Sequence, residues 1–434
     1  MSIKSIGIGI AGLGTVGGGL LRTLQRNRAL IRSRYGVDLR VVKAADLDAG
    51  RRKASGLPAK ALSGDFHDLL GDADVQVVVE LMGGTGAARE LMTGALRADK
   101  HVATANKALL AKHWTEIFSL AQERGLTVGF ESSVMSGVPI IRGMQAGLAG
   151  NRIESILAIL NGTSNFILSR MARGLEFAAA LAEARKRGLC EADASMDLDG
   201  HDAVQKLAIL GSIATGRWLP PDRIYREGIG QIEALDLEEA REEFGYALRP
   251  LAVFKNNARL VEARVHPTFV PLGHPLASVE NEFNAALIKT DAAGPVTFAG
   301  KGAGSLPAAS GVLGDVVQMA RALVLEPGRA PLTAMIPGAG AAEVLPVDEI
   351  SSKFYLRFSV LDRPNVLSYI AGKLGERKVS IATCHQRGRS ERGAVPVIMV
   401  THSARGGAIR EALAEIDAAR AIVKRKTIAI RIEE

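Results

Sequence analysis

Residues 6–17 read IGIGIAGLGTVG, an apolar run that leads directly into a glycine-rich turn. The run from Ile6 to Ala11 has the composition of a buried strand, and a helical pattern continues after the turn toward Leu30. In this context the glycines permit a tight turn and allow the backbone to approach a pyrophosphate at the helix N-terminus. We therefore predict that a nicotinamide dinucleotide is bound by the turn residues Gly12, Leu13, Gly14, Thr15, Val16 and Gly17.

Short apolar runs recur through the first 131 residues and alternate with helical segments. Such alternation is typical of repeated βαβ units and a parallel sheet. We predict an α/β Rossmann domain over residues 1–131, with strands at Ser5–Ala11, Leu39–Ala45, Val75–Leu81, His101–Thr104 and Leu126–Phe130.

Three further segments follow this domain. Residues 132–325 mix strand-like and helical patterns, including a long helix at His201–Thr215, and are predicted to form an α+β domain. Residues 326–352 are rich in proline and glycine, which is typical of a linker. Residues 353–434 follow the order strand, helix, strand, strand, helix, strand, which predicts a ferredoxin-like βαββαβ module.

Composition excludes several classes of protein. Hydrophobic residues make up 47% and charged residues 23% of the 434 positions, which argues against a disordered chain. Cys190 and Cys384 are the only cysteines and lie far apart, so we expect no disulfide framework and a cytoplasmic location. The uncharged stretch Ser5–Leu21 is too short and too rich in glycine to span a membrane.

The net charge of +8 lies entirely in the segment from Lys353 to the end of the chain. A basic face could bind nucleic acid, but aromatic residues make up only 4% of the chain and no RNA- or DNA-binding motif is present. We interpret the excess as a solvated basic surface and predict no nucleic-acid partner.

The end of the predicted strand Leu39–Ala45 bears on the choice of cofactor. Asp46 could accept a hydrogen bond from an adenosine ribose hydroxyl and favour NAD. Arg51, with two further basic residues after it, could instead neutralise the 2′-phosphate of NADP. The sequence leaves both cofactors open.

Two lysines and a cluster of acids are candidates for the chemistry. Lys107 follows the predicted strand His101–Thr104, at the edge where open α/β sheets bind ligands. Five carboxylates lie between Glu191 and Asp202, and Lys206 shares a helix face with Asp202 because the two are four residues apart. Such an acidic cluster suits a substrate that carries an ammonium group.

These motifs together resemble the homoserine dehydrogenase family. The resemblance is carried over about residues 5–325 by the glycine turn, Ala105-Asn106-Lys107, Glu131 to Ile140, Leu160-Asn161-Gly162-Thr163-Ser164-Asn165, the acidic stretch ending at Lys206, and Gly302-Ala303-Gly304 with Pro307. The tail resembles an ACT domain, with Asp362 to Leu367 at its first strand-to-helix turn.

The resemblance implies an oxidoreductase that interconverts L-homoserine and L-aspartate 4-semialdehyde with NAD or NADP, in threonine and methionine biosynthesis. It implies Lys206 as the general acid/base and Lys107 as a second lysine near the reacting oxygen. It implies substrate binding by Glu191, Asp197, Asp202 and Thr163, and backbone approach to the dinucleotide at Gly188 and Gly302.

The resemblance also implies a monovalent cation, often sodium, held mostly by carbonyl oxygens in the loop of Glu131, Val134, Ser136 and Val138. A homodimer or higher homo-oligomer, formed through residues 132–325, and a threonine effector at the ACT domain are expected on the same ground. Asn365 replaces the glycine common in effector-binding ACT turns, although Asn tolerates a left-handed conformation.

An amino-acid-sensing regulatory protein with a vestigial dehydrogenase site is the alternative. In such a protein the ACT module would bind the ligand and the catalytic residues would serve no purpose. The presence of Lys107, Glu191, Asp202 and Lys206 favours the enzyme.

Overall fold

The computed structural model describes residues 3–190, 193–257, 259–325, 338, 340–386 and 393–434. The chain divides into two units, each assembled from several stretches of sequence. The first unit contains Met1–Ile156, Val204–Arg223 and Phe283–Ala342, and the second contains Leu157–Ala203, Ile224–Glu282 and Glu343–Glu434. The strand β7 (Ile153–Ile159) and the helix α10 (His201–Thr215) each begin in one unit and end in the other.

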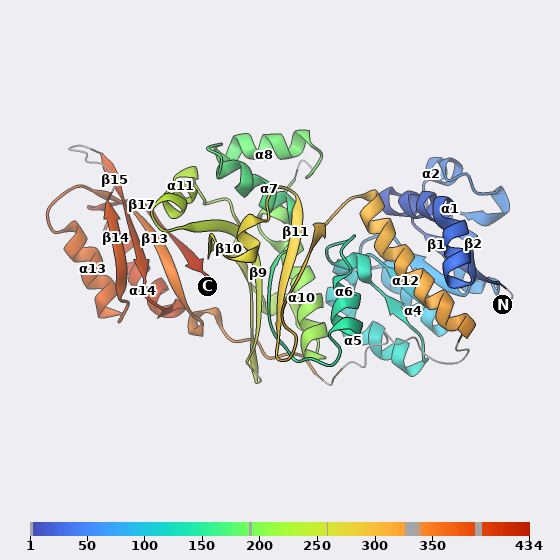
Figure 1. Ribbon diagram of the computed structural model, residues 1–434. Helices are drawn as coiled ribbons and strands as arrows, with labels where there is room; N and C mark the ends of the chain where they lie inside the picture. Colours follow the sequence, from blue (N-terminus) through green and yellow to red (C-terminus); the bar gives the residue numbers. More distant parts are fainter. Residues whose placement is uncertain (1–2, 191–192, 258, 326–337, 339, 387–392) are drawn as a thin grey trace. The chain divides into compact units, whose positions relative to one another are not determined.

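A parallel sheet of order β3-β2-β1-β4-β5-β6 forms the centre of the first unit (Figure 1). Its strands are β1 (Lys4–Ala11), β2 (Val37–Ala45), β3 (Leu62–Ser63), β4 (Val77–Glu80), β5 (His101–Thr104) and β6 (Val128–Gly129). This is the strand order of a doubly wound dinucleotide-binding domain. The five predicted strands are confirmed, and the short β3 is added at one edge.

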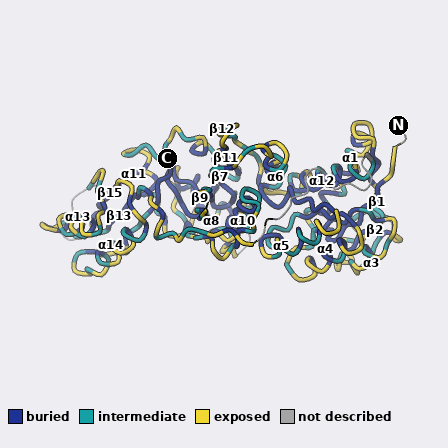
Figure 2. The backbone as a smooth tube through the Cα atoms, turned by 90° about the horizontal axis from the view of Figure 1, so that it is seen from below, coloured by how far each residue is buried: buried dark blue, intermediate teal, exposed yellow. Residues whose placement is uncertain are grey.

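Helices connect these strands and cover the sheet. They are α1 (Thr15–Tyr35), α2 (Ala49–Ala54), α3 (His67–Gly71), α4 (Ala87–Arg97) and α5 (Lys107–Glu123). The last six residues of β1 are buried, as Figure 2 shows for the interior of the unit. A strand covered on both faces requires such a continuous apolar run, which is the pattern that the sequence shows.

A helix from much later in the chain completes this core. The helix α12 (Ser305–Leu325) packs its buried residues Ala309, Val312 and Val316 into the same cluster as Ile8 and Ile10 of β1. Gly19 of α1 makes the close approach possible, because a Cβ there would lie 2.5 Å from Ser305 Oγ. The first unit also contains α6 (Ile140–Arg142) and the antiparallel hairpin of β11 (Phe283–Thr290) and β12 (Gly294–Lys301).

The second unit combines short helices with long strands. Its helices before the tail are α7 (Gly162–Met171), α8 (Phe177–Lys186), α9 (Ser195–Leu198) and α11 (Ala234–Glu242). The strands β9 (Tyr246–Asn257) and β10 (Leu260–Pro271) pair antiparallel over their full length, and β8 (Tyr225–Arg226) pairs with β10. The predicted helix at 201–215 is confirmed as α10.

The tail elements follow the predicted order. They are β13 (Ser351–Leu361), α13 (Val366–Glu376), β14 (Ile381–Gln386), β15 (Ala394–Thr401), the short β16 (Ala404–Arg405), α14 (Gly406–Ala418) and β17 (Val423–Ile432). β13 pairs antiparallel with β15 and β17, and β17 pairs parallel with β10 through Thr268↔Arg431 and Phe269↔Ile432. The tail sheet therefore continues into the β9–β10 pair. Residues 326–337 and 339 of the predicted linker lie outside the described residues.

A buried ion pair connects α11 to the tail. Asp236 is fully buried and accepts from Arg357 Nε at 2.6 Å and from Arg357 Nη2 at 3.1 Å. Tyr355 donates its hydroxyl to the same carboxylate at 3.2 Å. Within the described residues, no helix is long and apolar enough to cross a membrane.

We expect Asp236→Ala to destabilise the second unit by about 3–5 kcal/mol, because it leaves the Arg357 guanidinium buried without its partner. Urea unfolding, followed by circular dichroism, would show the transition at lower urea. The control is Glu242→Ala on the exposed last residue of α11. Equal midpoints for the two variants would contradict the importance of the pair.

Candidate functional site

The glycine turn after β1 has the geometry of an anion-binding loop. Gly12 adopts a φ of 96°, which favours glycine, and a Cβ on Gly17 would lie 2.0 Å from the carbonyl oxygen of Gly12. The helix α1 begins at Thr15 with no side-chain cap and no acidic residue in its first turn. Its N-terminal amides and dipole are therefore available to a phosphate group.

Asp46 and Arg51 both lie beside this loop. Asp46 accepts from the backbone N–H of Leu13 at 2.7 Å and from that of Asp48 at 2.9 Å, so its carboxylate holds the loop in place. Arg51 is exposed, and its Nη1 lies 4.0 Å from Asp46 Oδ2 and 3.6 Å from the position of a Cβ on Gly14. Arg52 instead donates to the carbonyl oxygens of Asp46 and Leu47. Of these two arginines, Arg51 is the one placed against the glycine turn.

Lys107 begins α5 at the same edge of the sheet. The parallel register pairs Ala11 with Glu80 and Glu80 with Thr104, so the ends of β1, β4 and β5 lie side by side. Thr104 donates its hydroxyl to Glu80 at 2.6 Å and accepts from the N–H of Asn106 at 2.9 Å. The Lys107 side chain is half-buried, and the residues before it are held by this chain of bonds.

Glu80 was not among the predicted site residues. It is fully buried, accepts from the N–H groups of Met82 and Gly83, and has a pKa raised by burial. Its position as the one charged residue at the end of the apolar run 75–81 was the available signal, because a buried acid needs a structural or chemical reason.

Asn161 joins the two described carboxylates of the predicted substrate site. Its Nδ2 donates to Asp197 at 2.7 Å and to Asp202 at 3.0 Å, while its Oδ1 accepts from the N–H of Ser164 and caps α7. Asp202 is 8% exposed and Asp197 is half-buried. The structure thus brings these two acids together, and the amide that bridges them is a site residue that the sequence reasoning missed.

The other predicted substrate ligands are Thr163 and Glu191, and Gly188 was predicted to approach the dinucleotide. Thr163 is buried and donates its hydroxyl to the carbonyl oxygen of Leu189 at 2.9 Å, so it connects α7 with the start of the acidic stretch. Glu191 lies outside the described residues. Gly188 has a φ of 69° with open space around it, the conformation of a glycine that ends a helix, here α8.

Lys206 lies in the second turn of α10, one turn after Asp202. Its side chain is half-buried, and the following residues Leu207–Leu210 are buried. The segment after α10 contacts α5, because Trp218 donates its indole N–H to the carbonyl oxygen of Ala111 at 2.9 Å. Lys107 and Lys206 therefore belong to the same unit.

The loop predicted to hold a cation follows β6. Glu131 is buried, and its carboxylate accepts from the N–H groups of Ile141 and Arg142, so its side chain caps α6. Met135 and Ser136 adopt left-handed φ values of 53° and 36°. The backbone of this loop therefore turns sharply and is not extended. No group of three or more acidic, His or Cys side chains suited to a metal occurs among the described residues. A cation here would depend on main-chain oxygens.

Val134 and Val138 are buried on either side of this turn, and Gly311 of α12 makes room for it. A Cβ on Gly311 would lie 2.7 Å from the carbonyl oxygen of Ser136. Gly302 also has a packing role, since a Cβ there would lie 2.1 Å from the Asn284 side chain.

We expect Asn161→Ala to destabilise the protein more than Asn161→Ser. Serine keeps the cap on α7, worth about 1 kcal/mol, whereas both changes remove the amide between two carboxylates. Urea unfolding of both variants separates the cap from the bridge. If Asn161→Ser is as stable as the unsubstituted protein, the bridge contributes nothing to stability.

Comparisons with known proteins show which family this chain resembles. A sequence profile for homoserine dehydrogenase matches residues 139–317, and one for the NAD-binding domain of homoserine dehydrogenase matches residues 12–131. The chain is 40% identical over 434 residues to the homoserine dehydrogenase of Neisseria gonorrhoeae, with 99% of each chain covered. It is 39% identical over 436 residues to that of Pseudomonas aeruginosa, with 100% of each covered.

Solved structures give the same result. A homoserine dehydrogenase from Thiobacillus denitrificans has a TM-score of 0.93 at 40% identity and covers 100% of this chain and 99% of its own. A hyperthermophilic archaeal homoserine dehydrogenase in complex with NADPH has a TM-score of 0.62 at 28% identity, over 73% of this chain and 97% of its own. The identity extends over the whole length, and the matched regions together cover residues 12–131 and 139–317, so the chain belongs to the homoserine dehydrogenase family.

Proposed function

We propose that this homoserine dehydrogenase uses Lys206 as the general acid and base of the hydride-transfer reaction. The observation that carries the proposal is the order of groups along α10, where the bridged carboxylate Asp202 precedes Lys206 by one turn. An acid that binds the substrate ammonium and an amine that handles its proton thus occupy successive turns of one helix.

The reaction transfers a hydride to or from a carbon atom of the substrate and a proton to or from the oxygen on that carbon. The bound nicotinamide supplies or accepts the hydride. In the direction of reduction, the aldehyde carbon gains the hydride and the carbonyl electrons move onto oxygen. The Lys206 ammonium stabilises the growing negative charge and gives its proton to that oxygen, which leaves a neutral amine. In the direction of oxidation the same amine removes the proton of the hydroxyl.

The amino-acid end of the substrate requires its own partners. Asp197 and Asp202 are held as a pair by Asn161, and their negative charges suit the substrate ammonium. We assign Glu191 to the same task, with Thr163 connecting α7 to the residues just before it. Lys107 supplies a second positive charge for the reacting oxygen, positioned by the bonds among Glu80, Thr104 and Asn106.

We expect Lys206→Ala to lower kcat by about 10²–10⁴-fold, the usual contribution of a positioned acid/base, with the fold retained. Initial rates of NADPH oxidation with aspartate semialdehyde and circular dichroism measure both. The control is Lys186→Ala at the exposed end of α8. Unchanged turnover of Lys206→Ala would reject the assigned role.

NADP is the cofactor that the loop favours in this proposal, although NAD also fits the fold. The Asp46 oxygens already accept two backbone N–H groups, and Arg51 lies against the glycine turn. A guanidinium at this place can pair with a 2′-phosphate. We assign Gly188 and Gly302 to backbone contacts with the same dinucleotide.

We expect Arg51→Ala to raise the KM for NADPH about 10- to 100-fold and to leave the KM for NADH nearly unchanged, because only NADPH carries the phosphate. Lys53→Ala, on the exposed third residue of the basic run, is the control. Equal changes for both cofactors would show that Arg51 does not read the phosphate.

Three further features complete the proposal. A monovalent cation such as sodium would be held by main-chain oxygens of Glu131, Val134, Ser136 and Val138, at the turn that Gly311 accommodates. The enzyme acts in the cytoplasm as a homodimer or higher homo-oligomer.

Residues 353–434 form an ACT domain that responds to threonine, and Asn365 adopts the left-handed conformation, φ 70°, that its turn requires. Initial rates with and without threonine test the last assignment.

A further inference from the structure

Three loops meet where the strands of the first unit's parallel sheet end. They are the glycine turn of residues 12–17, residues 81–86 between β4 and α4, and residues 105–107, which lead from β5 into α5. Leu81 donates its N–H to the carbonyl oxygen of Ala11 at 2.8 Å, and a Cβ on Gly12 would lie 2.5 Å from the carbonyl oxygen of Leu81. The loop 81–86 therefore lies against the turn proposed to bind the dinucleotide.

Hydrogen bonds rather than packing hold the middle of this loop. Gly83 and Gly84 both adopt left-handed φ values, 76° and 70°, which favour glycine. Both are exposed, and beyond their chain neighbours no heavy atom lies within 4 Å of a Cβ built on either. Glu80 accepts from the N–H of Met82 at 2.9 Å and from that of Gly83 at 3.1 Å. Asn106 Nδ2 donates to the carbonyl oxygen of Gly84 at 2.7 Å, so one carboxylate and one amide fix the backbone of the loop.

The same two side chains hold the start of α5. Thr104 donates its hydroxyl to the other oxygen of Glu80 at 2.6 Å and accepts from the N–H of Asn106 at 2.9 Å. Asn106 Oδ1 accepts from the N–H of Leu109 at 3.1 Å and caps α5, whose first residue is Lys107. The position of Lys107 relative to the preceding loop is thus set through the Glu80 carboxylate and the Asn106 amide.

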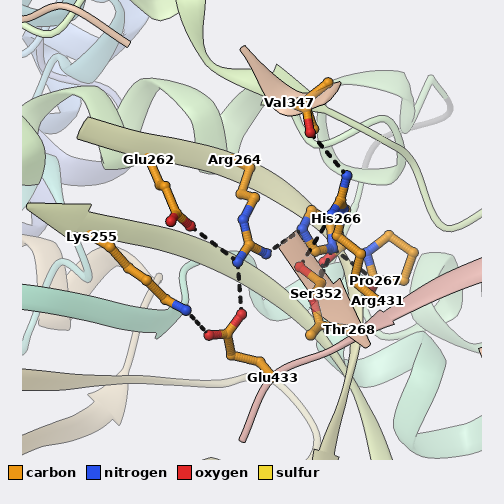
Figure 3. Close-up of polar contacts among 10 residues, drawn as sticks. All are labelled: Lys255, Glu262, Arg264, His266, Pro267, Thr268, Val347, Ser352, Arg431 and Glu433. Atoms are coloured by element: carbon orange, nitrogen blue, oxygen red, sulfur yellow. Dashed lines mark hydrogen bonds and ion pairs between the residues drawn. The ribbon is translucent and has the colours of Figure 1, made fainter. Parts of the chain in front are cut away.

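Glu80 is stabilised in a different way from another buried carboxylate, Glu433 in the second unit. Glu433 pairs with Arg264 at 2.7 Å and also with Lys255, as Figure 3 shows. Glu80 is 0% exposed, and among the residues that the structure describes no cation lies within ion-pair distance of its carboxylate. Its charge is met by hydrogen-bond donors alone, and a buried acid of this kind needs a structural or chemical reason.

The groups around the Glu80 carboxylate are donors. Two backbone N–H groups, the Thr104 hydroxyl and the Asn106 amide form hydrogen bonds with it. Burial raises the pKa of Glu80, and these hydrogen bonds act in the opposite direction. An ionised carboxylate accepts at both oxygens, whereas a glutamine of the same shape would present N–H donors on one side. The arrangement therefore favours the charge of the side chain as well as its shape.

We propose that Glu80 is a positioning residue for the dehydrogenase reaction, whose carboxylate fixes Lys107 relative to the glycine turn by holding the loop 81–86 and the start of α5 together. The inference rests on the proposed role of Lys107 at the reacting oxygen. A displacement of about 1 Å in such a group lowers turnover about 100-fold, so the carboxylate and the lysine are expected to act as one unit.

A double-mutant cycle between Glu80 and Lys107 tests the proposal. We expect Glu80→Gln to lower kcat for the reduction of aspartate semialdehyde about 10- to 100-fold at saturating NADPH, with a smaller change in the KM for aspartate semialdehyde. In a Lys107→Ala background the same substitution should have little further effect on kcat, because no ammonium remains to be positioned. A residue that serves stability alone would lower kcat by the same factor in both backgrounds.

Thr104 provides a second test that leaves Glu80 in place. Thr104→Val keeps the shape and removes the hydroxyl between Glu80 and Asn106, so we expect it to lower kcat as Glu80→Gln does. Thr104→Ser keeps the hydroxyl and should retain most of the turnover. The matched control is Thr93→Val in α4, which removes another buried hydroxyl of the same unit, bonded to the carbonyl oxygen of Arg89. It should leave kcat unchanged even where it lowers the melting temperature.

The outcomes separate this inference from the proposed function. Lys107→Ala with unchanged kcat would reject the role of Lys107 and the positioning role of Glu80 with it. Lowered kcat in Lys107→Ala, together with equal factors for Glu80→Gln in both backgrounds, would reject the positioning role alone. Unchanged kcat in both Glu80→Gln and Thr104→Val, with circular dichroism spectra like that of the unsubstituted protein, would also overturn it.

Discussion

The parallel pairing of β1, β4 and β5 is the constraint on which the dehydrogenase site depends. In a parallel sheet the carboxyl ends of all strands meet at one edge, and the register here places Ala11, Glu80 and Thr104 side by side. The glycine turn follows the first of these residues and Lys107 follows the last by three positions. A one-residue change of register would move Glu80 away from Thr104 and release the bonds that position the start of α5.

Buried charged groups in the second unit are held by specific partners from other elements. Asp236 and Arg357 neutralise each other and connect α11 with β13, and Arg264 is matched by Glu433. The acids Asp197 and Asp202 are held together by one amide, that of Asn161. Arg431 of β17 is buried as well, donates to Ser352 Oγ and lies over the Phe354 ring.

The elements that the sequence predicted best are those with strong local patterns. The strands of residues 1–131 and the helix α10 were expected within a few residues of their observed bounds, because burial on both faces requires continuous apolar runs and helices repeat every 3.6 residues. The two-residue β3 was missed because so short a strand has no periodicity. Asn161 was quoted within a motif but given no role, since its contacts with residues 36 and 41 positions away follow no local spacing.

The sequence by itself determined the family, the dinucleotide turn and the candidate lysines and acids, because each rests on residue types at short fixed spacings. Only the tertiary structure decided that α12 completes the core around β1, that β17 pairs with β10, and that Glu80 supports the residues before Lys107. It alone shows that Arg264 of β10 is paired with Glu433, which follows the neighbouring strand β17. The reason is physical: burial and pairing of charges are set by which distant segments exclude water together, and residue spacing along the chain carries no record of that.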